Sequence, residues 1–273
     1  GQTIYHNSQE KISKQLGNGK LLSQLTKKNI VYNFRQNDIK NGGEGAPLTP
    51  IFHNLILKEN KIDVPSCVLN IGGISNITIV RNYNRYLFSS KDIGPGNCLI
   101  DTWVRKNSNN KFDKDGEIAL SGKCNEIILE QAQELFANRP NQKNLSFDIN
   151  DFDVSFARGL SLEDGAATLT DFTAHIIGGA LFSFSSNIKK KLFKVLISGG
   201  GRKNKYLIKK IKEITKQNIV IQPIDDYGVD GDFVESQAFA YLAIRSILKE
   251  PISFPDTTGC LKPCTGGEII KFT

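Results

Sequence analysis

VLNIGGISNITIVRNYNRYLFSSKDIGPGNCLID, from Val68 to Asp101, is the stretch that decides the fold. It predicts a first strand, a glycine turn, a second strand, a polar turn around residues 82–84 and a third strand over residues 86–89. Apolar runs bounded by Gly, Asn and Asp are typical of strands and turns. Three such runs at hairpin spacing predict a β-meander.

Both tips of this meander have features of a ligand site. Gly72 and Gly73 let the backbone approach a ligand closely and present N–H groups to an anion, which predicts a phosphate cradle. At the other tip the third strand is expected to end in Asp92, before the rigid turn 94–96, where a general base would stand. The alternative is that both tips are ordinary turns and that Asp92 only caps the local backbone.

The length and composition indicate a folded protein. A chain of 273 residues with 39% hydrophobic content suits one large domain or two ordinary ones. The longest apolar run, residues 176–184, is shorter than the roughly 20 residues that span a bilayer, and no secretory signal opens the chain. We therefore expect a cytoplasmic protein without a membrane partner. The chain contains no Met and begins at Gly1 within what looks like a motif, so we expect residues to precede Gly1.

The cysteines and the charge exclude several classes of protein. Five cysteines are an odd number in a long chain, which argues against a disulfide framework and favours a reducing compartment. Cys260 and Cys264 form a lone CxxxC pair, so we expect two free thiols and no structural metal. Residues 113–123 lack the register of a calcium-binding loop. The net charge of +7 is spread along the chain without a nucleic-acid-binding motif, which predicts no such partner.

Residues 35–50, RQNDIKNGGEGAPLTP, are expected to form a loop of unusual backbone conformation. Its glycines would bring the backbone close to a polar ligand, and Arg35 could grip a carboxylate through two hydrogen bonds. The alternative is a loop that only starts the helix predicted from Pro50.

A second glycine turn follows a buried strand at residues 192–198. The turn 199–201 leads into a helix at residues 205–215, and this order suits a nucleotide or phosphate site. The turn is neither a P-loop nor a dinucleotide fingerprint.

The remaining elements are predicted from periodicity and caps. A capping box, SLED, opens a long helix at residues 161–190, in which His175 is expected to pack rather than react. The other helices are predicted at residues 50–57, 97–106, 126–136 and 233–248, with a weak helical region at 8–28 broken by glycines, and strands at 30–34 and 218–222.

Eight blocks resemble, in the order of the chain, the anhydro-N-acetylmuramic acid kinases. They are GQTIYH, NFRQNDIKNGGEGAPLTP, LNIGGISNIT, KDIGPGNCLID, LEDGAATLTDFTAHII, SGGGRKN, DDYGVDGDFVESQAFAYLAIR and TTG. GGEGAPL and DIGPGN are specific to that family, and the similarity covers nearly the whole chain.

The resemblance implies an α/β protein with the two-lobed actin, hexokinase and Hsp70-like ATPase fold. Residues 35–256 would form one complete lobe, with 1–34 and 257–273 as remnants of the other. The family uses ATP, Mg²⁺ and water to open the 1,6-anhydro ring of the amino sugar and to phosphorylate O6. The product, N-acetylmuramic acid 6-phosphate, belongs to cell-wall peptidoglycan recycling.

The resemblance also implies the site residues. Asp92 matches the catalytic base of the family's DxGPGN motif. The expected nucleotide contacts are Gly72, Gly73, Asn76, Gly199, Gly200, Gly201 and Asn204. The expected contacts to the sugar are Gln2, His6, Arg35, Gly43, Gly45 and Ala46.

Three departures from the family pattern leave an alternative open. The glycine-rich MSGTSxDG turn that begins family members has no counterpart here, Asn33 replaces the acid of the usual DFR, and residues 143–147 differ from the family's block. The alternative is an N-terminally truncated, non-catalytic remnant, in which apolar surface would be exposed where strands are absent. Whether a homodimer forms is also left open.

Overall fold

The computed structural model describes residues 3–7, 9–83, 86–139, 147–186, 192–215 and 218–272. It divides into two compact units. Unit 1 comprises residues 1–64, 80–90 and 233–273, and unit 2 comprises residues 65–79 and 91–232. Within the described ranges, no helix is both long and apolar enough to cross a membrane.

A five-stranded sheet in the order β6-β5-β4-β7-β8 organises unit 2, and the outer parts of β5 and β6 belong to unit 1. The strands are β4 (Ser66–Ile71), β5 (Ile74–Asn82), β6 (Leu87–Pro95), β7 (Phe193–Ser198) and β8 (Ile219–Pro223). Consecutive strands β4, β5 and β6 are neighbours, which confirms the predicted meander. Strand β7 pairs in parallel with both β4 and β8.

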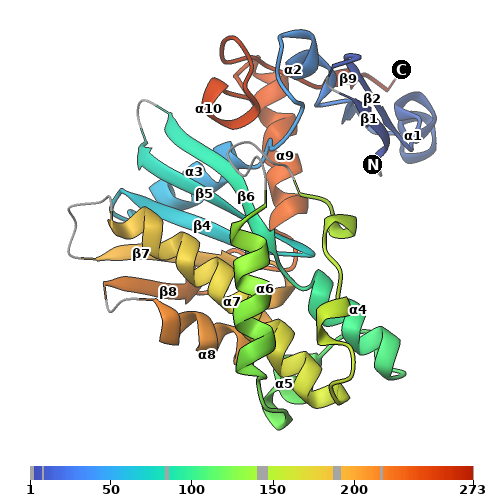
Figure 1. Cartoon of the computed structure of the whole chain (residues 1–273). Coiled ribbons are helices and arrows are strands. Elements are labelled where there is room, and N and C mark those ends of the chain that lie inside the picture. Colours follow the sequence, from blue (N-terminus) through green and yellow to red (C-terminus); the bar gives the residue numbers. More distant parts are fainter. Residues whose placement is uncertain are drawn as a thin grey trace. The chain divides into compact units, whose positions relative to one another are not determined.

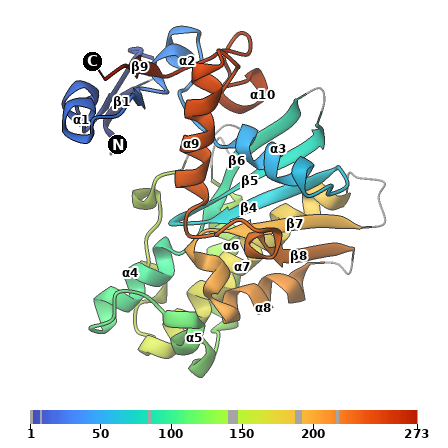
Figure 2. The same ribbon diagram turned by 180° about the vertical axis from the view of Figure 1, so that it is seen from behind.

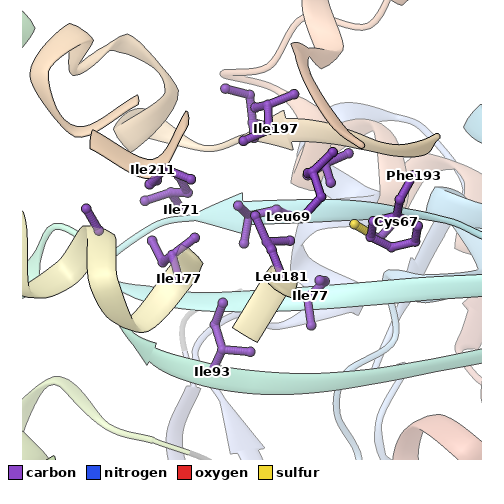
Figure 3. Close-up of a cluster of buried hydrophobic side chains, with 14 of the residues drawn as sticks. Cys67, Leu69, Ile71, Ile77, Ile93, Ile177, Leu181, Phe193, Ile197 and Ile211 are labelled. Carbon is purple, nitrogen blue, oxygen red and sulfur yellow. The ribbon is translucent and has the colours of Figure 1, made fainter. Parts of the chain in front are cut away.

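The helices α7 (Leu162–Ser186) and α8 (Lys205–Ile214) lie against one face of this sheet (Figure 1, Figure 2). Because side chains alternate along a strand, Cys67, Leu69 and Ile71 of β4 all point to this face. They are fully buried in one cluster with Ile177 of α7 and Ile211 of α8 (Figure 3). Burying one such Leu or Ile side chain stabilises the fold by about 1.5–3 kcal/mol. This apolar layer therefore fixes the strand ends from which the site is built.

A second cluster packs further helices onto the first half of α7. It includes Trp103, whose indole N–H donates to the carbonyl oxygen of Leu162 at 2.9 Å. A Cβ at Gly165 would lie 2.2 Å from the Trp103 ring, so only glycine admits the ring here. The remaining helical elements of unit 2 are α4 (Cys98–Asn107), α5 (Glu117–Ser121), α6 (Glu126–Ala137), and the short 3₁₀ turns η1 (Lys114–Gly116), η2 (Ile149–Asp151), η3 (Ser155–Ala157), η4 (Gly200–Lys203) and η5 (Ile224–Tyr227).

The start of α7 agrees with the predicted capping box. The Ser161 hydroxyl accepts the backbone N–H of Asp164 at 3.0 Å. This hydrogen bond satisfies one of the N–H groups that a helix start leaves without a partner. His175 lies within α7, half-buried, with Nδ1 2.8 Å from the carbonyl oxygen of Asp171.

Unit 1 contains two small antiparallel pairs, β1 with β2 and β3 with β9. Its elements are β1 (Thr3–Asn7), β2 (Ile12–Gln15), α1 (Gly19–Thr26), β3 (Ile30–Tyr32), α2 (Gln36–Lys40), α3 (Pro50–Glu59), α9 (Val234–Ile247), α10 (Pro255–Thr258) and β9 (Glu268–Ile270). The helix predicted across residues 8–28 is wrong in its first half, because β2 pairs with β1 there. The second half is α1, which begins where the Asn18 side chain caps the N–H groups of Lys20 and Leu21.

Large apolar side chains are exposed in the N-terminal part of unit 1. They include Ile4, Leu16, Leu21 and Leu25. The backbone contacts group residues 35–64 and 233–256 with residues 1–34, whereas the resemblance assigned them to the second lobe. That assignment to lobes stays a prediction.

Candidate active site

The two glycine turns of unit 2 lie at the same edge of the sheet. Strands β4 and β7 run in parallel with Asn70 opposite Ser198, so Gly72 and Gly199 follow neighbouring strand ends. Gly199 has a φ of 79°, and a Cβ there would lie 2.6 Å from the carbonyl oxygen of Ile71. Glycine is therefore required where the second turn packs against the end of β4.

The third glycine turn, within DIGPGN, is fastened to the first. The Asn97 backbone N–H donates to the carbonyl oxygen of Gly72 at 2.7 Å, and its side-chain amide donates to the same oxygen at 3.1 Å. The N–H of Gly96 donates to Gly73 at 2.9 Å. The N–H of Gly72 itself donates to Ile74 at 3.2 Å. The sequence blocks LNIGGISNIT and KDIGPGN thus form one connected backbone structure.

Asp92 lies on β6 and is half-buried. Its Oδ2 accepts the backbone N–H of Phe147 at 3.0 Å. The strand was expected to end at Asp92 but continues to Pro95. The extension holds because the buried hydroxyl of Ser75 on β5 donates to the Pro95 carbonyl at 3.1 Å, and because proline is tolerated on an edge strand such as β6.

The turn after β7 is braced by Arg202, which sequence reasoning did not single out. Its guanidinium bonds both oxygens of Asp225, at 2.8 and 3.0 Å, and Oδ1 of Asp232 at 2.7 Å. A further N–H donates to the Gly199 carbonyl at 3.0 Å. The hydrogen bonds to Asp225 and Asp232 raise the pKa of Arg202, and the hydrogen bonds from Arg202 lower the pKa of Asp225 to about 2. The sequence signal for these ion pairs was the acidic block DDYGVDGD, which follows SGGGRKN in the chain.

Of two predicted nucleotide contacts, Asn204 has a local role in the structure. Asn204 is buried, and its side-chain oxygen caps α8 by accepting the N–H of Leu207 at 2.9 Å. Asn76 is half-buried on β5. Their contact with a nucleotide stays a prediction.

In unit 1, the predicted sugar loop is wrapped around Asp38, another residue that sequence reasoning missed. This buried carboxylate accepts the N–H of Gly45 at 2.7 Å and the Thr258 hydroxyl at 2.6 Å. A Cβ at Gly43 would lie 2.2 Å from Asp38 Oδ2. Part of the stretch expected to be loop is helical, since α2 begins with Ile39 N–H donating to the Arg35 carbonyl at 3.1 Å.

Arg35 and His6 converge on this loop at Gly45. Arg35 donates from Nη1 to the Gly45 carbonyl at 3.2 Å, and a Cβ at Gly45 would lie 3.2 Å from Cε1 of the exposed His6. Among the described residues the buried Nε of Arg35 has no hydrogen-bond partner. Burial lowers the pKa of Arg35, and the charge of Glu235 opposes that shift. Ala46 follows Gly45 in the same loop.

Some predictions fall outside the described residues, namely Gln2 and, in the block 143–147, all but Phe147. The substitution at Asn33 has a clear local role. Its side-chain amide donates to Oε1 of Glu268 at 2.5 Å. An acid at position 33 would instead bring two carboxylates together.

The fold and these turns define the class of protein. Glycine turns at neighbouring strand ends, one of them leading into the first turn of α8, are typical of α/β proteins that bind phosphate groups. The sequence profile of the family "Anhydro-N-acetylmuramic acid kinase" matches residues 1–271. The chain belongs to this family of sugar kinases, and the predicted α/β fold of the actin, hexokinase and Hsp70-like class is the fold of that family.

Similar curated proteins carry the same description. The anhydro-N-acetylmuramic acid kinase of Pelagibacter ubique is 58% identical over 99% of this chain and 72% of its own length. That of Zymomonas mobilis is 40% identical over 98% of this chain and 71% of its own length. A solved structure, the activator of the 2-hydroxyisocaproyl-CoA dehydratase from Clostridium difficile with bound ADPNP, shares 14% identity at a TM-score of 0.41, covering 71% of this chain and 69% of its own.

Proposed function

We propose that this protein converts 1,6-anhydro-N-acetylmuramic acid, ATP and water to N-acetylmuramic acid 6-phosphate and ADP, within peptidoglycan recycling in the cytoplasm. The observation that carries the proposal is Asp92, whose carboxylate stands three residues before the end of β6 and just ahead of the turn that Asn97 fastens to Gly72. The family membership supports the same reaction.

Asp92 serves as the general base. Its carboxylate takes a proton from water as the water oxygen attacks the anomeric carbon and the bond from that carbon to O6 breaks. The hydrogen bond from Phe147 N–H to Oδ2 fixes the orientation of the carboxylate. O6, released from the ring, attacks the γ-phosphorus, and ADP leaves.

The glycine turns of unit 2 bind ATP, with Gly72 and Gly73 at the phosphates and the turn 199–204 at the nucleoside. Glycine lets the backbone approach the nucleotide closely, and the hydrogen bond from Arg202 to the Gly199 carbonyl holds the second turn in its conformation. Mg²⁺, bound to the phosphates, would neutralise the charge that develops during transfer. Phosphoryl transfer depends mainly on positioning and charge, so rigid turns are the contribution expected from this part of the chain.

Arg35 recognises the lactyl carboxylate of the sugar. Its guanidinium is already held beside Gly45, and its buried Nε lacks a partner among the described residues. The ordered loop 42–46 contributes backbone groups to the polar substituents of the ring.

The decisive experiment measures phosphate transfer from labelled ATP to 1,6-anhydro-N-acetylmuramic acid. We would compare the parent chain, Asp92→Asn and, as a matched control, Asp63→Asn on the exposed surface. Each would be assayed alone and with the glycine-rich N-terminal segment of a relative supplied. Asp92→Asn is expected to lower turnover at least about 100-fold, the scale of general-base catalysis, while the control keeps parental activity.

Two outcomes would contradict the proposal. If Asp92→Asn kept the activity of the parent chain, Asp92 would not be the general base. A folded parent chain without transfer under both conditions would favour the non-catalytic remnant.

A further inference from the structure

Three buried side chains with metal-binding atoms meet in unit 1. They are Asp38, Cys260 and Cys264, with relative exposures of 1%, 2% and 8%. One carboxylate oxygen and the two sulfur atoms all lie within 4.8 Å of one another. The CxxxC spacing alone predicted two free thiols, because Asp38 is more than 200 positions earlier in the chain and its approach is invisible in the sequence.

The backbone holds the two cysteines in place independently. Gly259, in the left-handed conformation with a φ of 76°, ends α10 and turns the chain just before Cys260. The next residue, Leu261, donates its N–H to the Asn41 carbonyl at 3.1 Å, which ties this segment to the end of α2. Cys264 is fixed by a two-way backbone bridge with Ser253, at 3.1 and 3.2 Å. The site therefore does not depend on flexible surface side chains.

The neighbouring hydrogen-bond donors suit metal-ligating atoms that carry negative charge, namely a carboxylate oxygen and a thiolate sulfur. Thr258 donates its hydroxyl to Asp38 Oδ1 at 2.6 Å, and Gly45 donates its N–H to Oδ2 at 2.7 Å. The Ser253 hydroxyl lies 3.0 Å from the sulfur of Cys264. Hydrogen-bond donors placed behind ligating atoms orient them and are a regular feature of protein metal sites.

Asp38 takes part in none of the ion pairs between described residues. A buried carboxylate whose hydrogen bonds come from neutral donors carries a desolvation cost that a cation would offset. Two sulfur atoms beside one carboxylate oxygen select a thiophilic cation over Mg²⁺ or Ca²⁺, which prefer oxygen ligands only.

We propose that Asp38, Cys260 and Cys264 bind one thiophilic divalent cation, with Zn²⁺ as the expected metal and water as the fourth ligand. Zinc–sulfur bonds of about 2.3 Å and zinc–oxygen bonds of about 2.1 Å at a tetrahedral angle place sulfur and oxygen about 3.6 Å apart. Cys264 Sγ and Asp38 Oδ1 are 3.9 Å apart, close to that separation, and the three ligand atoms all lie within 4.8 Å of one another, so they would draw together around the cation. Binding releases one proton from each thiol, and no electron transfer is involved.

The site has a consequence for the neighbouring loop. Asp38 Oδ2 accepts the N–H of Gly45. A cation bound to the other oxygen would fix the position of Asp38 and so restrict the motion of the loop 42–46. This consequence for the sugar loop rests on the proposed function, whereas metal binding itself does not. Metal binding is therefore tested by readouts that do not depend on turnover.

Metal binding is tested with Co²⁺ as a spectroscopic probe and Zn²⁺ as its competitor, on reduced protein first stripped with a chelator. We expect one Co²⁺ per chain, an absorption band from thiolate-to-cobalt charge transfer, and displacement by Zn²⁺. Cys260→Ser and Cys264→Ser should lose the band, and Asp38→Asn should weaken binding by at least about tenfold. Cys124→Ser, a half-buried cysteine in unit 2, is the matched control and should bind as the parent does.

A second measurement needs no substitution and so avoids variants that fail to fold. Zn²⁺ should protect Cys260 and Cys264 of the parent chain from alkylation, as located by peptide mass spectrometry, and leave the alkylation of Cys124 unchanged. Equal alkylation with and without Zn²⁺, a disulfide between Cys260 and Cys264 under reducing conditions, or a cobalt spectrum unaffected by the serine variants would each overturn the proposal.

Discussion

A Cβ at Gly96 would lie 2.3 Å from the carbonyl oxygen of Gly72. The turn that follows Asp92 and the first glycine turn are therefore in backbone contact, and no side chain fits between them. We expect Gly96→Ala to push the turns apart, lower the free energy of unfolding by about 1–3 kcal/mol, and raise the KM for ATP. Urea unfolding and steady-state kinetics check both expectations.

The matched control for this substitution is Gly179, an exposed position in α7. A Cβ there meets no atom within 4 Å. Gly179→Ala should raise the free energy of unfolding by about 0.5–1 kcal/mol, because alanine is the better helix former and loses less backbone entropy. An equal effect of the two substitutions would contradict the steric argument at Gly96.

The role of Arg35 predicts a change in substrate affinity. Arg35→Lys keeps the charge but loses the planar pair of donors, so kcat/KM for the sugar should fall about 10- to 100-fold, mainly through KM. Arg105→Lys, at an exposed position of α4, should leave both constants unchanged. Kinetics with the sugar varied at saturating ATP give kcat and KM for both variants. An unchanged KM in Arg35→Lys would remove Arg35 from the carboxylate contact.

The Arg202 and Asp225 pair predicts a stability effect with a defined pH window. Asp225 has a pKa of about 2 in the folded protein, below its usual value near 3.9. The stability it contributes is therefore complete above about pH 4 and is lost as pH falls toward 2. Arg202→Lys should cost about 1 kcal/mol at pH 7, a value reduced by solvent screening because the Asp225 side chain is 41% exposed.

The control for this pair is Lys209→Gln, which removes an exposed ion pair to Glu213 at 3.8 Å. Its effect on the free energy of unfolding should be near zero. If the Arg202→Lys loss measured by urea unfolding were the same at pH 7 and at the acid end of the window, the electrostatic explanation would fail.

His53 predicts a loss of stability at mildly acidic pH. Burial lowers the pKa of His53 to about 4, whereas the unfolded chain takes up the proton near pH 6.5. The folded state is therefore progressively disfavoured as pH falls from about 6.5 to 4, by at most about 3 kcal/mol. His53→Gln should flatten this part of the pH profile of unfolding. A parental slope in this variant would exclude His53 as the cause.

The sequence predicted the elements whose signals are local. The meander, the two glycine turns and the start of α7 rest on residues close together in the chain, and the structure confirms them. Strand β2 was missed because four residues with a weak pattern depend on pairing with β1. The extension of β6 past Asp92 was missed because Ser75, 20 positions before Pro95, supplies the anchoring bond.

The sequence predicted the part of the site that consists of the glycine turns and Asp92. It did not predict the residues whose roles depend on partners far away in the chain. Asp38 gains its role from Thr258, 220 positions away, and Arg202 from Asp225, 23 positions away. Such pairings have no periodicity in the sequence. The roles of the predicted site residues toward ATP and sugar stay predictions for the experiments above.

The hydrogen bond between Thr258 and Asp38 also determines which unit can fold first while the chain is being translated. Unit 1 is assembled from three separated segments, and its last segment begins at residue 233, whereas all of unit 2 is complete at residue 232. Domains generally fold as units while the chain emerges from the ribosome. Unit 2 can therefore fold on the nascent chain, whereas Asp38 lacks its Thr258 partner until the segment that begins at residue 233 has also been translated.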